Sequence, residues 1–202
     1  MTILALDTTS NLASVAIRKK GETLSVVSMD STAGFGHLIF SAIEKCRNEA
    51  NISLEEIDCF AAAAGPGSFT GVRVALSAVK GLAESLAKPV TGISNLRAIS
   101  SFGKNAGLRA VVLDARRSEV YGGVYDVDLR PVVAETVGPL EQFLATLDPA
   151  REYEIIHAHA EPLAPAIALC AEQDGPSRWL DPAALDANYV RRSDAELCWR
   201  EH

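Results

Sequence analysis

The stretch IDCFAAAAGPGSFTGVRVALSAVKGLAESL, residues 57–86, decides the fold because it joins an apolar run to a helical pattern through a glycine-rich turn. The apolar run predicts a buried strand over Asp58–Ala64. The spacing of the apolar residues after the turn predicts a helix over Val72–Ala87. A strand that runs into a helix in this way is typical of an α/β protein.

The turn Gly65–Gly71 between these elements is open to two interpretations. Gly65 and Gly67 permit backbone conformations closed to other residues, and either Ser68 or Thr70 can cap the helix. The N–H groups at a helix start favour an anion, so the turn could hold a phosphate, although a tight structural turn is the preferred interpretation. Neither common phosphate-binding motif fits, because no Gly-Lys-Ser/Thr follows the glycines and the dinucleotide fingerprint needs a shorter spacing.

The chain partly repeats itself, which predicts two lobes. An apolar strand ending in Asp, a short turn and a second strand occur near the N-terminus and again in the second half. We expect a ribonuclease-H-like first lobe over residues 1–104 and a smaller lobe over residues 105–202. The last segment packs back on one of them, and the sequence does not decide which. The expected strands are Thr2–Asp7, Ser14–Arg18, Thr23–Met29, Val90–Ile93, Val111–Asp114, Val120–Tyr125, Val132–Glu135 and Tyr153–His157. The expected further helices are His37–Ala50, Asn95–Phe102, Leu140–Leu147 and Leu163–Glu172.

The composition indicates an ordinary soluble, cytoplasmic protein. With 202 residues and 48% hydrophobic content the chain can bury a sizeable core. It shows no basic leader and no run of eighteen apolar residues, so we expect neither export nor a membrane span. It also has no Cys-x-x-Cys pair, so we expect its cysteines to be buried free thiols. The formal net charge of −7 opposes strong unaided binding to nucleic acid.

The motif GPGSFTGVR after an apolar strand, together with ILALDTTSNLASVAI at residues 3–17, resembles the TsaB family. That family is the inactive paralogue of TsaD in bacterial tRNA threonylcarbamoylation. The resemblance runs from Met1 to about Val127 and returns at residues 188–195, which look like the family's tail motif. It implies the actin-like ATPase (ASKHA) fold of sugar kinases, Hsp70 and TsaD, with the second lobe reduced.

In ATP-binding ASKHA proteins, two Asp-ended hairpins face each other across a cleft and hold phosphate and magnesium. The first hairpin here offers one carboxylate and three hydroxyls, but arginines follow the second aspartate where such ATPases have a glycine turn. The resemblance therefore predicts no catalytic residue and no metal or cofactor in the isolated chain, with ATP and metal used by partner subunits. The hairpins would be a vestigial phosphate site formed by Asp7, Thr8, Thr9, Ser10 and Asp114.

Histidines give little support for a metal site. TsaD carries a His-x-x-x-His pair on the helix that corresponds to His37–Ala50, whereas His37 has no such partner here. His157 and His159 share one side of an expected strand, with Glu161 nearby, and could furnish two ligands. A strand end facing water explains the pair equally well.

The helix after the glycine-rich turn carries a face of small residues, Val74, Ala78, Gly81 and Ser85, that would let another helix approach closely. One alternative is that the neighbouring helix of the same chain fills this groove. The other is an intersubunit bundle: in TsaB relatives the equivalent helices associate with TsaD, or with a second TsaB copy when TsaD is absent. The resemblance extends this partner-binding role to Phe40, Val74, Ala78 and Gly81.

The resemblance implies a noncatalytic subunit of the bacterial tRNA threonylcarbamoyladenosine (t6A) complex. Such a subunit dimerises with TsaD and recruits TsaE for threonylcarbamoyl transfer to the adenosine after the anticodon, and it reaches tRNA through the complex. Direct contact of Arg191 and Arg192 with tRNA is a weaker alternative to a solvated tail. The rival readings are a stand-alone ASKHA nucleotide hydrolase that uses Asp7 and Asp114, an M22-type metallopeptidase, and a self-associating scaffold.

Overall fold

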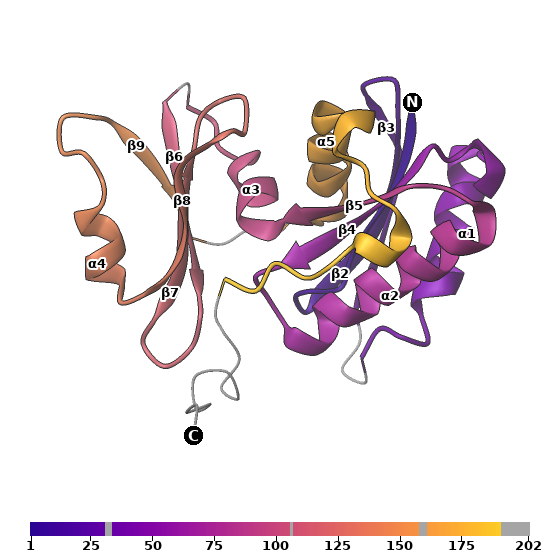
Figure 1. The fold of residues 1–202 in the computed structure, drawn as a ribbon, viewed down its shortest axis with the longest axis horizontal. Helices are drawn as coiled ribbons and strands as arrows, with labels where there is room; N and C mark the ends of the chain where they lie inside the picture. The colour runs from indigo at the N-terminus through magenta and orange to yellow at the C-terminus, as the bar shows by residue number, and fades with distance from the viewer. Residues whose placement is uncertain (31–33, 106, 158–160, 191–202) are drawn as a thin grey trace.

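The computed structural model describes residues 1–30, 34–105, 107–157 and 161–190. These residues form two β-sheets, one per lobe, with helices packed against each (Figure 1). The five-stranded sheet has the order β3-β2-β1-β4-β5 and the four-stranded sheet the order β8-β7-β6-β9. In both sheets a hairpin precedes a parallel strand, which agrees with the repeat expected from the sequence.

The five-stranded sheet is built around β1 (Thr2–Asp7). This strand pairs antiparallel with β2 (Leu12–Lys19), which pairs antiparallel with β3 (Glu22–Asp30). On its other side β1 pairs parallel with β4 (Cys59–Gly65), and β4 pairs parallel with β5 (Val90–Ser94). Because β1 and β4 are buried on both faces, their sequences are continuous apolar runs without alternation.

Helices cover both faces of this sheet. The helices α1 (Ile39–Ala50) and α2 (Phe69–Leu86) pack on the face that carries Leu4 and Leu6. The opposite face, which carries Ile3, is covered by α5 (Ala164–Asp174). The alternation of β1 residues between the two hydrophobic clusters follows from the period of two along a strand.

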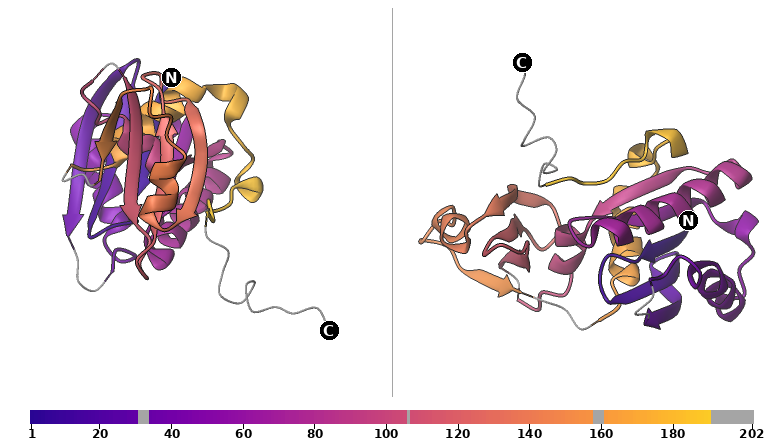
Figure 2. Two further views of the ribbon diagram at one scale, coloured as in Figure 1. Left: turned by 90° about the vertical axis from the view of Figure 1, so that its left-hand side faces the viewer. Right: turned by 90° about the horizontal axis from the view of Figure 1, so that it is seen from below.

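The four-stranded sheet lies beside the first lobe (Figures 1 and 2). Its strands are β6 (Leu108–Asp114), β7 (Val120–Tyr125), β8 (Pro131–Gly138) and β9 (Tyr153–Ile156). The short helix α4 (Leu140–Ala145) covers one face, where Phe143 packs on Val112 and Val124. The other face turns toward α3 (Asn95–Ser100), which joins the two lobes through a shared apolar cluster. Short 3₁₀ turns occur at Leu54–Glu56, Pro176–Arg178 and Pro182–Ala184.

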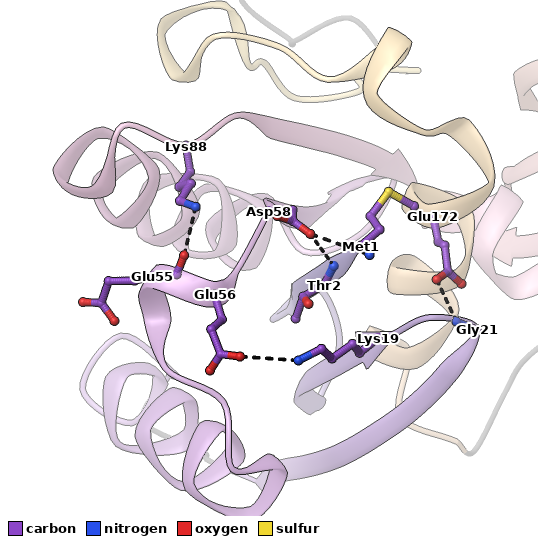
Figure 3. Close-up of polar contacts among 9 residues, drawn as sticks. All are labelled: Met1, Thr2, Lys19, Gly21, Glu55, Glu56, Asp58, Lys88 and Glu172. Carbon is purple, nitrogen blue, oxygen red and sulfur yellow. Dashed lines mark hydrogen bonds and ion pairs between the residues drawn. The ribbon is translucent and has the colours of Figure 1, made fainter.

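The prediction that the helix near Leu163–Glu172 belongs to the second lobe was wrong. This helix, α5, packs on β1 and β2 of the first lobe. The guanidinium of Arg18 lies 2.6 Å from a carboxylate oxygen of Glu172. The N–H of Gly21 donates to the Glu172 carboxylate at 2.9 Å (Figure 3). The physical reason is that α1 and α2 leave one face of the larger sheet uncovered, and an alanine-rich helix can approach that face closely.

The segment after α5 also lies on the first lobe as far as Val190. Leu180 and Val90 exchange backbone hydrogen bonds of 2.7 and 2.9 Å, and Leu185 is buried in the core beneath α2. The sequence left this placement open, and the described part of the segment settles it.

Polar contacts close the end of the larger sheet that lies away from the glycine-rich turn (Figure 3). The carboxylate of Asp58 accepts the N–H of Thr2 at 2.8 Å, and Lys19 Nζ lies 3.4 Å from Glu56. These contacts hold the start of β1 next to the start of β4. Within the described residues, no helix is long and apolar enough to cross a membrane.

The expected elements are confirmed, with shifts at their ends. The helix expected from Val72 begins at Phe69, because the Ser68 hydroxyl accepts the N–H of Gly71 at 3.2 Å and so caps the helix. Of the two proposed caps, Ser68 is therefore the one used. The strand expected over Val132–Glu135 is longer and spans β8.

Candidate functional site

A cleft of about 1260 Å³ lies between the lobes. It is lined by the turn after β1, the glycine-rich turn with the start of α2, the turn after β6 and the segment Ala187–Val190, and also by Gly34, Phe35 and Tyr121. Both Asp-ended turns predicted from the sequence therefore face one cavity.

The first turn is held by hydrogen bonds within the protein. Asp7 is completely buried, and its Oδ1 accepts the backbone N–H of Thr9 at 2.8 Å and the Thr9 hydroxyl at 2.6 Å. The Thr9 hydroxyl in turn accepts Asn95 Nδ2 at 2.6 Å, and the Thr8 hydroxyl donates to the carbonyl oxygen of Gly71 at 2.6 Å. Both threonine hydroxyls thus already serve the packing of this turn.

The third hydroxyl of the turn differs from the other two. Ser10 is exposed and donates to the carbonyl oxygen of Leu12 at 3.1 Å. Asn95 was not predicted as a site residue from the sequence. Its Oδ1 accepts the N–H of Gly65 at 3.2 Å, so Asn95 connects the turn after β1 with the glycine-rich turn. Its 3% exposure at the start of a helix identifies it only once the fold is known.

The glycines of the glycine-rich turn permit close backbone packing. A Cβ on Gly67 would lie 2.9 Å from the carbonyl oxygen of Thr9, and one on Gly71 would lie 1.9 Å from that of Thr8. The N–H of Ser68 donates to the Thr9 carbonyl oxygen at 2.8 Å. These contacts favour the structural interpretation of the turn, because the first hairpin occupies the space beside its glycines.

The second turn has an unusual backbone. Arg116, Arg117 and Ser118 have φ values of 62°, 56° and 62°, in the left-handed region that favours glycine. The N–H of Arg116 donates to Asp114 Oδ1 at 2.7 Å, which holds the turn together. Asp114 is exposed, and it lines the cleft together with both arginines.

The four residues predicted to bind a partner have different environments. Phe40 is 59% exposed, and none of the described residues places an atom within 4 Å of a Cβ built on Gly81. Val74 is half-buried, whereas Ala78 is buried in the core that α1 and α2 share. Because the space above Gly81 is open within the described part of the chain, the neighbouring helix α1 does not fill the groove there. Near the start of α2, the Arg73 guanidinium stacks 3.6 Å above the ring of Phe69.

The expectation for the histidines is only partly covered by the structure. His37 and His157 are exposed, and His159 lies outside the described residues. Among the described residues, no group of three or more His, Cys, Asp or Glu side chains could hold a metal ion.

The cysteines agree with the expectation of buried free thiols. Cys46, Cys59 and Cys170 are all free and buried. Burial raises the pKa of both the Cys59 and the Cys170 thiol to about 12. Thiols of this kind are poor nucleophiles at neutral pH. Cys198 lies outside the described residues.

Comparison with known proteins establishes the family. The family model of TsaD, tRNA N6-adenosine threonylcarbamoyltransferase, matches residues 31–173. An uncharacterized protein of Mycobacterium tuberculosis is 31% identical over 96% of this chain and 94% of its own. The tRNA threonylcarbamoyladenosine biosynthesis protein TsaB of Bacillus subtilis is 30% identical over a region that covers 62% of this chain and 55% of the B. subtilis protein. TsaB of Escherichia coli is 33% identical over a region that covers 63% of this chain and 56% of the E. coli protein. The chain belongs to the TsaB family.

Two solved structures share the fold of this chain. A Pseudomonas aeruginosa protein described as similar to the peptidase YeaZ superposes with a TM-score of 0.81 at 27% identity, over 94% of this chain and 99% of that one. YeaZ from the same organism gives a TM-score of 0.78 at 24% identity, over 93% and 99%. With the two-sheet topology, these likenesses confirm the predicted two-lobed ASKHA fold.

Proposed function

We propose that this chain is a noncatalytic subunit in the biosynthesis of t6A. It dimerises with TsaD and recruits TsaE, so that the threonylcarbamoyl group is transferred to the adenosine after the anticodon of tRNA. In this role it reaches tRNA through the complex and works in the cytoplasm. The names of the TsaB relatives support the pathway, and the cleft geometry supports the noncatalytic role.

The observation that carries the noncatalytic role is the packing of the first turn. The hydroxyls of Thr8 and Thr9 hold the glycine-rich turn and Asp7, so they are not available to a phosphate without rearrangement. Magnesium prefers carboxylate, carbonyl and water oxygens, and the two arginines after Asp114 repel a cation at the second turn. We therefore propose that ATP and metal are used by the partner subunits and that the isolated chain needs no cofactor.

The partner surface that we propose consists of the exposed parts of α1 and α2 around Phe40 and Gly81. Glycine inside a helix costs about 1 kcal/mol relative to alanine. No described atom packs on Gly81 within this chain, so a second helix from TsaD is a natural occupant of that space. Without TsaD, a second copy of the chain takes the same place.

Co-purification with TsaD tests this proposal. A Gly81→Trp substitution fills the space above α2 and is expected to abolish binding of TsaD, while thermal unfolding shows a folded chain. The matched control is Glu141→Trp, which puts the same side chain on an exposed position of α4 in the other lobe. Undiminished binding by Gly81→Trp would contradict the assigned surface.

The enzyme alternatives are tested on the isolated chain. The proposal predicts no ATP hydrolysis and no zinc or iron that survives purification. Hydrolysis that is lost in Asp114→Asn would support the nucleotide hydrolase instead, and a retained metal would support the metallopeptidase.

A further inference from the structure

Glu135 is a meeting point of hydrogen bonds from three separate parts of the chain. It lies half-buried on β8, at one edge of the four-stranded sheet. Its Oε1 accepts the hydroxyl of Tyr125 at 2.6 Å and also the hydroxyl of Ser94. Its Oε2 accepts Nδ2 of Asn188 at 2.7 Å. We refer to these four residues as the Glu135 cluster.

Asn188 is bound to both lobes at once. Its backbone N–H donates to the carbonyl oxygen of Ala64, the residue before Gly65 on β4, at 2.8 Å. Its own carbonyl oxygen is so close to Gly65 that a Cβ there would lie 3.4 Å away. The backbone of Asn188 is thus fixed on the first lobe, and its side chain on Glu135 of the second.

A second member of the cluster also belongs to the first lobe. Ser94 is the last residue of β5, and its hydroxyl oxygen accepts the N–H of Arg97 at the start of α3.

Tyr125 is 1% exposed, and burial together with the charge of Glu135 raises the pKa of its hydroxyl. The Tyr125 hydroxyl therefore remains protonated and acts as a donor to the Glu135 carboxylate.

Other contacts join the lobes without the Glu135 cluster. Leu96 and Ile99 of α3 pack in one apolar cluster with Val111 of β6, and Arg97 Nε donates to the Leu129 carbonyl oxygen at 3.0 Å. The lobes can therefore stay together when the cluster is broken. The Glu135 cluster supplies the contact that ties the segment Ala187–Val190, one wall of the cleft, to the second lobe.

We propose that Glu135 holds the segment Ala187–Val190 against the cleft, and that loss of the Glu135–Asn188 hydrogen bond releases this segment while both lobes stay folded. The segment is then a strap across the cleft, with its fixing point at Asn188. The Tyr189 hydroxyl also accepts Arg73 of α2 at 3.4 Å, so the strap extends from the cleft to the start of that helix. This inference does not depend on the proposed function.

Hydrogen exchange of the full chain, followed by mass spectrometry, tests the strap. Glu135→Ala removes both acceptor oxygens, so the Asn188 side chain loses its partner on the second lobe and peptides that contain Asn188 should exchange at least about tenfold faster. Asn188→Asp should do the same, because two carboxylates would then face each other. Asn188→Ala removes only the strap side of the bond and should also raise exchange.

The double variant Glu135→Gln/Asn188→Asp is the decisive arm. The new amide can donate to the new carboxylate, so exchange in the strap should return to within about twofold of the wild-type rate. Glu141→Gln, an exposed position on α4, serves as control and should change nothing. Peptides from β1 and β4 should keep wild-type protection in every variant. Unchanged strap exchange in Glu135→Ala, or no recovery in the double variant relative to Asn188→Asp, would overturn the proposal.

Discussion

Two glycines of the same helix should respond in opposite ways to alanine. Gly71 and Gly81 both lie within α2, so alanine is favoured at either position by intrinsic helix propensity. Their surroundings differ: a Cβ on Gly71 would lie 1.9 Å from the carbonyl oxygen of Thr8, whereas none of the described residues has an atom within 4 Å of a Cβ on Gly81. The comparison isolates the packing of the glycine-rich turn from helix propensity.

The expected magnitudes follow from these contacts. At Gly81 the propensity gain of about 0.5–1 kcal/mol is unopposed, and the free energy of unfolding should rise by that amount. At Gly71 overpacking against a buried backbone costs about 1–3 kcal/mol or more. Loss of the Thr8–Gly71 hydrogen bond adds about 1 kcal/mol, so the propensity gain is outweighed and the net destabilisation is about 1–3.5 kcal/mol. For a protein of this size that lowers Tm by roughly 2–14 °C.

Urea and thermal unfolding of both variants provide the assay. The measurements should be made at concentrations at which sedimentation shows a monomer, because Gly81 lies on the proposed partner surface. A Gly71→Ala variant as stable as the wild type would refute the idea that this glycine serves close contact with the first hairpin. A destabilised Gly81→Ala monomer would show that some contact covers that position within the chain.

Two further predictions concern charge and thiols. Burial alone would raise the pKa of Glu172, but the hydrogen bonds from Arg18 and Gly21 outweigh it and lower that pKa. The stabilisation from Glu172 is therefore present above the carboxyl's unfolded pKa near 4.3 and is lost as the pH falls through the lower folded value. Glu172→Gln should lower the free energy of unfolding by about 1–2 kcal/mol at pH 7, and urea titrations below about pH 4 should show the gap closing. For the three buried cysteines we expect labelling by a thiol reagent only after unfolding; rapid native labelling of any of them would contradict their burial.

Much of the first lobe could be predicted from local sequence. β1 and β4 are continuous apolar runs because both faces are buried, and Ser68 has the side chain that a helix cap needs. These features depend on neighbours along the chain, and the sequence shows such neighbours directly. The arginines that replace a glycine turn after Asp114 could likewise be recognised from the sequence, because they follow this aspartate directly along the chain.

Features that depend on distant residues could not be predicted in this way. The helical pattern of α5 is visible, but nothing in it says which sheet it covers, and the choice depends on a face left open by α1 and α2. Asn95 contacts Thr9, 86 positions earlier, and Glu135 contacts Asn188, 53 positions later. A single polar residue carries no local sign of such a partner.

The central claim is that this chain supports t6A formation through a surface and not through its own cleft chemistry. The most direct measurement is the t6A content, by mass spectrometry, of tRNA from cells that lack their TsaB-family protein and express variants of this chain. Asp114→Asn keeps an acceptor for the Arg116 N–H but removes the carboxylate charge from the cleft. The account predicts that the wild type and Asp114→Asn both restore t6A, whereas folded Gly81→Trp does not. Restoration by Gly81→Trp together with failure of Asp114→Asn would contradict it.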